Sequence, residues 1–89
     1  MKGLIFILVI STQSFSDQKI EKFQAANARY NDSDYIGAIQ LYEQIASEKW
    51  QSGYLYYNLG NSYFRAGMVG QSIWAYNKAL KLSPRFENI

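Results

Sequence analysis

The chain has 89 residues, of which nine are basic, seven are acidic and none is histidine or cysteine, and its formal net charge is +2. This length allows one small domain. The near balance of charge gives no electrostatic basis for binding nucleic acid. Without histidine and cysteine, the commonest general base, the thiol nucleophile and most transition-metal ligands are absent. We therefore expect a protein that is not an enzyme, binds no metal and needs no cofactor.

The first sixteen residues have the pattern of a secretory signal peptide. Lys2 precedes the apolar run 4–10, and Ser14 and Ser16 lie where small residues precede a signal-peptidase cut. The run is far shorter than the roughly 20 residues that a membrane-spanning helix needs. The sequence therefore predicts a signal peptide over 1–16 and a domain over 17–89 that is exported to the periplasm or cell envelope. The alternative is that this run is a buried strand or helix of the domain.

The rest of the chain reads as helical throughout. Apolar residues at helical spacing predict helices over 18–31, 35–48, 54–66 and 69–82, and no strand pattern competes with them. Ser33 or Asp34 is expected to cap the second helix, and Gly67 to adopt the left-handed conformation after the third. Pro84 is expected to end the fourth. The predicted fold class is all-α.

A shift of 34 residues aligns the two halves of this helical region. Aromatic residues then match aromatic ones and small residues match small ones, as in Phe23 with Tyr57, Ala26 with Gly60, Asn27 with Asn61, and Tyr42 with Tyr76. A fixed period of two helices indicates that each pair buries its apolar face against the next pair. The alternative is two helical hairpins with coincidental similarity.

The second unit, residues 53–86, resembles the tetratricopeptide repeat (TPR). The residues that carry the resemblance are Tyr56, Leu59, Gly60, Tyr63, Gly67, Ser72, Tyr76, Ala79 and Pro84, and only Ser72 departs from the family pattern. The first unit, residues 19–52, keeps Ala38 and Tyr42 but has Arg29 at a tyrosine position and Trp50 at the proline position. The resemblance implies two helix-turn-helix repeats stacked as a short right-handed α-solenoid that serves as a protein-protein interaction scaffold.

A looser resemblance extends to one group of exported proteins. The signal segment together with the runs at 56–67 and 75–84 is similar to the repeat proteins of bacterial aerotolerance (Bat) operons. This likeness implies a scaffold of the bacterial envelope.

In the TPR family, the first helix of each repeat lines a concave groove that holds an extended peptide or a partner helix. Carried over to this chain, the resemblance implies that the partner contacts Phe23, Asn27, Tyr54, Tyr57, Asn58, Asn61 and Arg65, with Ile20, Gln24 and Asn31 on the same side. Asparagine amides both donate and accept hydrogen bonds, which suits a peptide backbone. A clamp for a terminal carboxylate is disfavoured, because Phe23 stands where such repeats place a lysine. The alternative is that these side chains are solvated and the groove is empty.

The last helix has an apolar side with no polar helix after it. Ile73, Ala79, Leu80 and Leu82 are expected on this side. An uncovered apolar end of a repeat array implies more chain, self-association or a partner. The competing function is therefore a structural spacer, or a self-associating repeat fragment, with no ligand in its groove.

Overall fold

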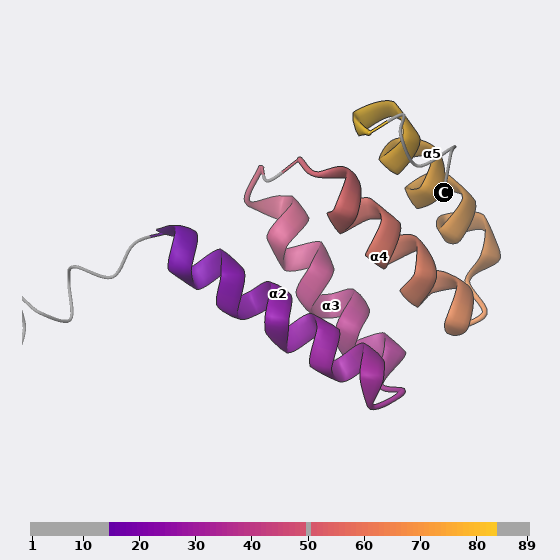
Figure 1. Ribbon diagram of the computed structural model, residues 1–89. Helices are drawn as coiled ribbons and strands as arrows, with labels where there is room; N and C mark the ends of the chain where they lie inside the picture. Colours follow the sequence, from indigo (N-terminus) through magenta and orange to yellow (C-terminus); the bar gives the residue numbers. More distant parts are fainter. Residues whose placement is uncertain (1–14, 50, 84–89) are drawn as a thin grey trace, which may run out of the picture.

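The computed structural model describes residues 15–49 and 51–83. These residues form four helices, which are α2 (Phe15–Asn31), α3 (Tyr35–Ser47), α4 (Gly53–Arg65) and α5 (Val69–Leu82). Each helix packs against the next one in the chain, so that the four lie in a single row (Figure 1). No strand occurs in the described ranges. The predicted all-α fold of helical repeats is confirmed.

The predicted helix limits agree closely with the structure. α5 has the predicted range, α3 and α4 differ from it by one residue, and α2 begins at Phe15 instead of residue 18. The predicted signal peptide lies outside the described residues except for Phe15 and Ser16, and the roles expected of Trp50 and Pro84 lie outside them as well. Within the described ranges, no helix has the length and apolar character that crossing a membrane requires.

The two helix pairs are closed by the same turn. Ser33 and Gly67, which are 34 residues apart, both have positive φ, 65° and 83° respectively. In each turn the following N–H, from Asp34 or Met68, donates to the carbonyl five residues earlier at 2.8 Å. Gly67 therefore has the predicted left-handed conformation, and Ser33 adopts it without being glycine. The 34-residue repeat is present in the backbone itself.

The caps of the two units differ. Asp34 caps α3 as predicted, because its Oδ1 accepts the N–H of Gly37 at 3.0 Å. Met68 occupies the equivalent position before α5 and makes no side-chain cap. The start of α5 therefore lacks the stabilisation of about 1 kcal/mol that an aspartate cap gives to α3.

Small residues let α4 and α5 approach closely at Gly60. The buried Ser72 hydroxyl donates to the Gly60 carbonyl at 3.0 Å. A Cβ at position 60 would lie 2.7 Å from ring carbons of Tyr76. The other side chains expected to pack in this unit are at most 4% exposed, namely Tyr56, Leu59, Tyr63 and Ala79. The predicted packing of the second unit is therefore confirmed.

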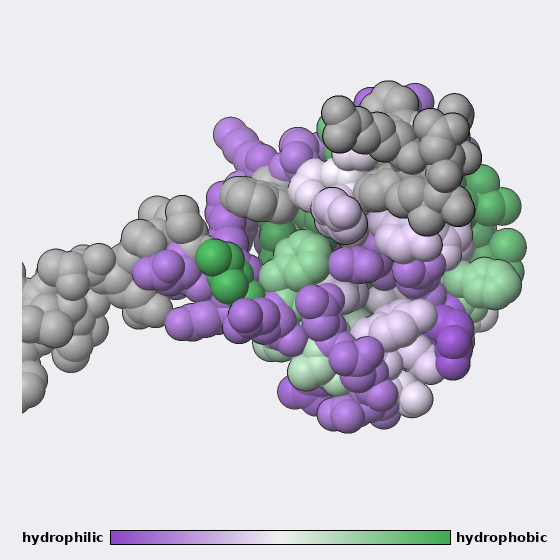
Figure 2. Space-filling view, viewed as in Figure 1, coloured by the Kyte–Doolittle hydropathy of each residue, from purple (hydrophilic) through white to green (hydrophobic). Residues whose placement is uncertain are grey.

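The outer side of α5 is apolar and exposed. Val69, Ile73 and Trp74 are 55%, 57% and 52% exposed, and Leu82 is 41% exposed. Hydrophobic residues are visible at this edge of the molecule in Figure 2, whereas the surface over α2 is mostly hydrophilic. The expectation that Ala79 lies on this side is wrong, since Ala79 is 1% exposed and belongs to the core.

The close approach at Gly60 can be tested by substitution. We expect Gly60→Ala to lower the free energy of unfolding by about 1–3 kcal/mol, because the new methyl group displaces the Tyr76 ring. Gly70→Ala is the matched control in α5, where a Cβ meets nothing within 4 Å. That control should leave stability unchanged or raise it by up to about 1 kcal/mol. Urea unfolding followed by circular dichroism measures both variants, and equal effects would contradict the close approach.

Candidate functional site

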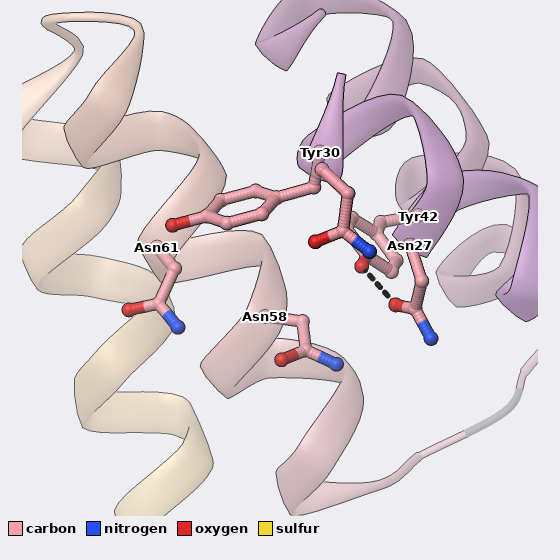
Figure 3. Close-up of a pocket in the computed structure, with 6 residues that line it drawn as sticks. Asn27, Tyr30, Tyr42, Asn58 and Asn61 are labelled. Atoms are coloured by element: carbon pink, nitrogen blue, oxygen red, sulfur yellow. Dashed lines mark hydrogen bonds between the residues drawn. The ribbon is translucent and has the colours of Figure 1, made fainter. Parts of the chain in front are cut away.

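A pocket of about 310 Å³ opens between the first helices of the two units. It is lined by Asn27, Tyr30 and Asn31 from α2, Tyr42 from α3, and Asn58 and Asn61 from α4 (Figure 3). All six side chains are polar or aromatic, and none carries a formal charge at neutral pH. Within residues 15–49 and 51–83, no acidic side chains gather in threes as a metal site would need. The pocket is therefore suited to a neutral, hydrogen-bonding ligand.

One tyrosine–asparagine pair holds the site in each unit. The Tyr42 hydroxyl donates to Oδ1 of Asn27, and the Tyr76 hydroxyl donates to Oδ1 of Asn61. The two pairs are again 34 residues apart. In both units, the tyrosine lies in the second helix and its hydroxyl donates to an asparagine of the first helix. Because the amide oxygens accept these protons, the amide N–H groups of Asn27 and Asn61 remain as donors for a partner.

Each tyrosine ring is itself fixed by an aromatic neighbour. The rings of Phe23 and Tyr42 meet edge to face with centroids 5.6 Å apart, and the rings of Tyr57 and Tyr76 are tilted with centroids 5.8 Å apart. Such pairs stabilise a fixed ring orientation by about 0.5–1.5 kcal/mol. The two asparagines are therefore positioned by packed side chains.

Among the pocket asparagines, Asn58 has the most hydrogen-bonding groups available to a ligand. It lies between Asn27 and Asn61 in Figure 3. It is partly buried in the pocket wall, and its amide makes no hydrogen bond to any residue that the structure describes. Its carbonyl and its NH₂ group are both available to one ligand. Such an amide can accept from a peptide N–H and donate to a peptide carbonyl at once.

Burial raises the pKa of three tyrosines whose hydroxyls donate hydrogen bonds between helices. Burial, with a smaller contribution from nearby Tyr30, raises the pKa of Tyr42 to about 12. Burial also raises the pKa of Tyr76. Tyr63, whose hydroxyl donates to Glu43 at 2.5 Å between α4 and α3, has a raised pKa through burial and through this hydrogen bond. These hydroxyls are therefore donors throughout the physiological range.

The structure brings together three of the seven residues that the sequence proposed for partner binding. Asn27, Asn58 and Asn61 line the pocket, as does Asn31. Phe23 does not line it, because it packs on Tyr42 at the edge of the core.

The remaining three residues proposed from the sequence lie elsewhere on the surface. Arg65 donates to the Tyr35 hydroxyl at 2.7 Å and lies 5.0 Å above the centroid of that ring, so it joins α4 to α3. Tyr54 is 67% exposed and Tyr57 is 39% exposed, and neither lines the pocket. These three therefore contribute to binding only if the partner extends past the pocket.

Two lining residues were missed from the sequence. Tyr30 lies one helical turn beyond Asn27 on the same side of α2, and that spacing could have indicated it. Tyr42 was assigned to packing, because a sequence does not show that the hydroxyl of a core tyrosine emerges in a groove. The 34-residue repeat aligned Tyr42 with Tyr76, but it did not show that the Tyr42 hydroxyl lines the pocket.

The raised tyrosine pKa values predict a loss of stability at alkaline pH. In the unfolded chain the pKa of Tyr42 returns to about 10. The folded state then binds the proton more tightly, so the stabilisation is complete below about pH 10 and is lost as the pH rises toward about 12. We expect the urea midpoint to fall over this window and to fall less in Tyr42→Phe. The matched control, Tyr54→Phe at an exposed tyrosine, should keep the wild-type pH dependence; identical profiles for all three proteins would refute the assignment.

Comparison with known proteins bears on the repeat architecture of the chain. The family model described as "Tetratricopeptide repeat" matches residues 53–86, the unit that contains α4 and α5. No curated protein matches the chain. The match supports a TPR protein and, with the four described helices, an all-α architecture of TPR-like repeats.

Proposed function

We propose that this chain is a non-enzymatic protein-protein interaction scaffold that holds an extended peptide in the pocket between α2 and α4. The TPR match supports the general class, because such repeats generally mediate protein-protein interactions. The observation that carries the proposal is the meeting of Asn27, Asn58 and Asn61, from two helices, in one uncharged pocket.

The chemistry of the pocket favours a peptide backbone over a charged ligand. An extended peptide presents an N–H or C=O group at every residue, about 3.4 Å apart along the chain. Asn58 can bind both groups, while the amides of Asn27 and Asn61 donate to carbonyls on either side. A helical partner has its backbone groups bonded internally except at its ends, so it would offer the asparagines fewer groups. An extended segment is therefore the better fit.

The size of the pocket limits how much of a peptide it binds. Its volume of about 310 Å³ is near the lower end of the range for small-ligand sites, about 300–1,000 Å³. Only a short stretch fits inside, so the affinity of the pocket alone should be low. Additional contacts to Tyr54 and Tyr57 would extend the site along the exposed side of α4.

The proposed location is the bacterial envelope. This proposal rests on the signal-peptide pattern of residues 1–16, and a role beside the products of an aerotolerance operon rests on the looser resemblance alone. If the chain is exported and cut as proposed, N-terminal sequencing of the secreted product should begin at Asp17. A product that keeps the apolar run 4–10 would instead indicate a retained segment.

Asn58 provides the test of the binding site. Selection from a library of unstructured peptides should yield ligands of the wild-type protein whose affinity falls at least about tenfold in Asn58→Ala, a loss of about 1.4 kcal/mol. Gln71→Ala is the matched control, an exposed amide of α5 that does not line the pocket. Isothermal titration calorimetry would measure both variants after circular dichroism has shown that they are folded.

The same ligands distinguish backbone recognition from side-chain recognition. We expect alanine substitution along a selected peptide to change its affinity little, whereas N-methylation of one central amide should abolish binding. Ligands that bind Asn58→Ala as well as wild type would overturn the proposed site.

A further inference from the structure

The repeat geometry shows what kind of element the exposed side of α5 would accept. On α3, the side that α4 covers includes Tyr35, Ile39 and Glu43: Arg65 contacts Tyr35, Tyr63 bonds to Glu43, and Ile39 is only 5% exposed. The residues 34 positions later are Val69, Ile73 and Asn77. All three are exposed, and Lys81 follows one turn after Asn77. We call these four residues the open face of α5.

The contact of α3 with α4 also fixes the direction of such an element. Arg65, at the end of α4, bonds to Tyr35 at the start of α3, so the two helices are antiparallel (Figure 1). A helix placed on α5 in the same way would therefore bring its N-terminal half beside Lys81.

Charge is divided unequally between the two helix pairs. Residues 49–83 contain four basic side chains and no acidic one. Residues 17–48 contain six acidic and three basic side chains. The second unit is therefore net positive and the first unit net negative, so that unlike units of two molecules attract each other.

α2 has a surface that matches these requirements. Its residues Glu21, Ala25 and Ala28 are the 34-residue equivalents of Leu55, Leu59 and Ser62 of α4, which are at most 1% exposed. The three α2 residues are all exposed. Asp17 lies one turn before Glu21 on the same side of the helix. We call these four residues the open face of α2.

The two open faces are complementary in size and in sign. Ala25 and Ala28 are small, so they leave room for Val69 and Ile73 of the other molecule. Asp17 and Glu21 occupy the N-terminal half of α2, which the antiparallel arrangement places beside Lys81. Of the basic side chains of α2, Lys22 is paired with Glu48 at 2.5 Å and Arg29 with Asp34 at 3.1 Å.

We infer that this protein associates head to tail, with the open face of α5 seated on the open face of α2 of a second copy. The association continues the row of helices from one molecule into the next and is independent of the proposed peptide pocket. Such a contact between unlike faces does not stop at two copies unless it closes into a ring. A symmetric contact between two α5 helices would instead leave Lys81 without an opposite charge, because the open face of α5 contains no acidic side chain.

Two charge-reversal variants test the pairing of the faces. Lys81→Glu changes only the α5 face, and Asp17→Lys with Glu21→Lys changes only the α2 face. Each variant alone opposes like charges and should associate at least about tenfold more weakly than wild type. An equimolar mixture opposes unlike charges and should recover association. Lys49→Glu is the control for net charge, because Lys49 lies in the connection between α3 and α4.

Sedimentation velocity of the full chain over a range of concentrations provides the measurement. The wild-type weight-average mass should rise past that of a dimer, and added salt should reduce it because the attraction is electrostatic. Circular dichroism shows whether each variant is folded, and recovery in the mixture itself requires both to be folded. Recovery also separates this contact from association through residues 4–10, which no substitution changes.

Three results would overturn the inference. A wild-type protein that stays monomeric at all concentrations would show that the two open faces do not bind each other. A mass that stops at the dimer and is unaffected by Asp17→Lys with Glu21→Lys would indicate a symmetric α5 contact. Variants that associate no better mixed than alone would show that the two faces do not meet.

Discussion

The hydrogen bond from a second-helix tyrosine to a first-helix asparagine links the packing of this molecule to its surface. Tyr42 binds Asn27 and Tyr76 binds Asn61, and both tyrosines are held by an aromatic ring of the first helix. Gly60 leaves space for the Tyr76 ring by lacking a side chain. A change in the spacing of α4 and α5 would therefore move Asn61, a pocket residue, although neither Gly60 nor Tyr76 lines the pocket.

Most of the fold could be predicted because its determinants are local. Apolar spacing gave the four helices, and Asp34 and Gly67 marked turns through chemistry that acts over a few residues. Ser33 shows the limit of this approach, since its positive φ is imposed by the hydrogen bonds of the turn and not by the residue type. The start of α2 was placed too late because its first residues were assigned to the signal segment.

The candidate site could be predicted only in part, because helix spacing shows which side a residue occupies but not what it touches. All three asparagines that the sequence indicated line the pocket. Arg65 is on the expected helix, but it is held by Tyr35 of the neighbouring unit, a contact 30 residues away in the chain. Tyr42 was missed because one side chain both fills the core and exposes its hydroxyl.

The unequal distribution of charge also affects a single molecule. With six acidic and three basic side chains in residues 17–48, and four basic and no acidic ones in residues 49–83, the row of helices has an electric dipole from its first unit to its second. Near an anionic surface such as a phospholipid leaflet, the field turns the α5 end toward the surface. The row of helices then stands on its second unit, with the first unit directed toward the solution.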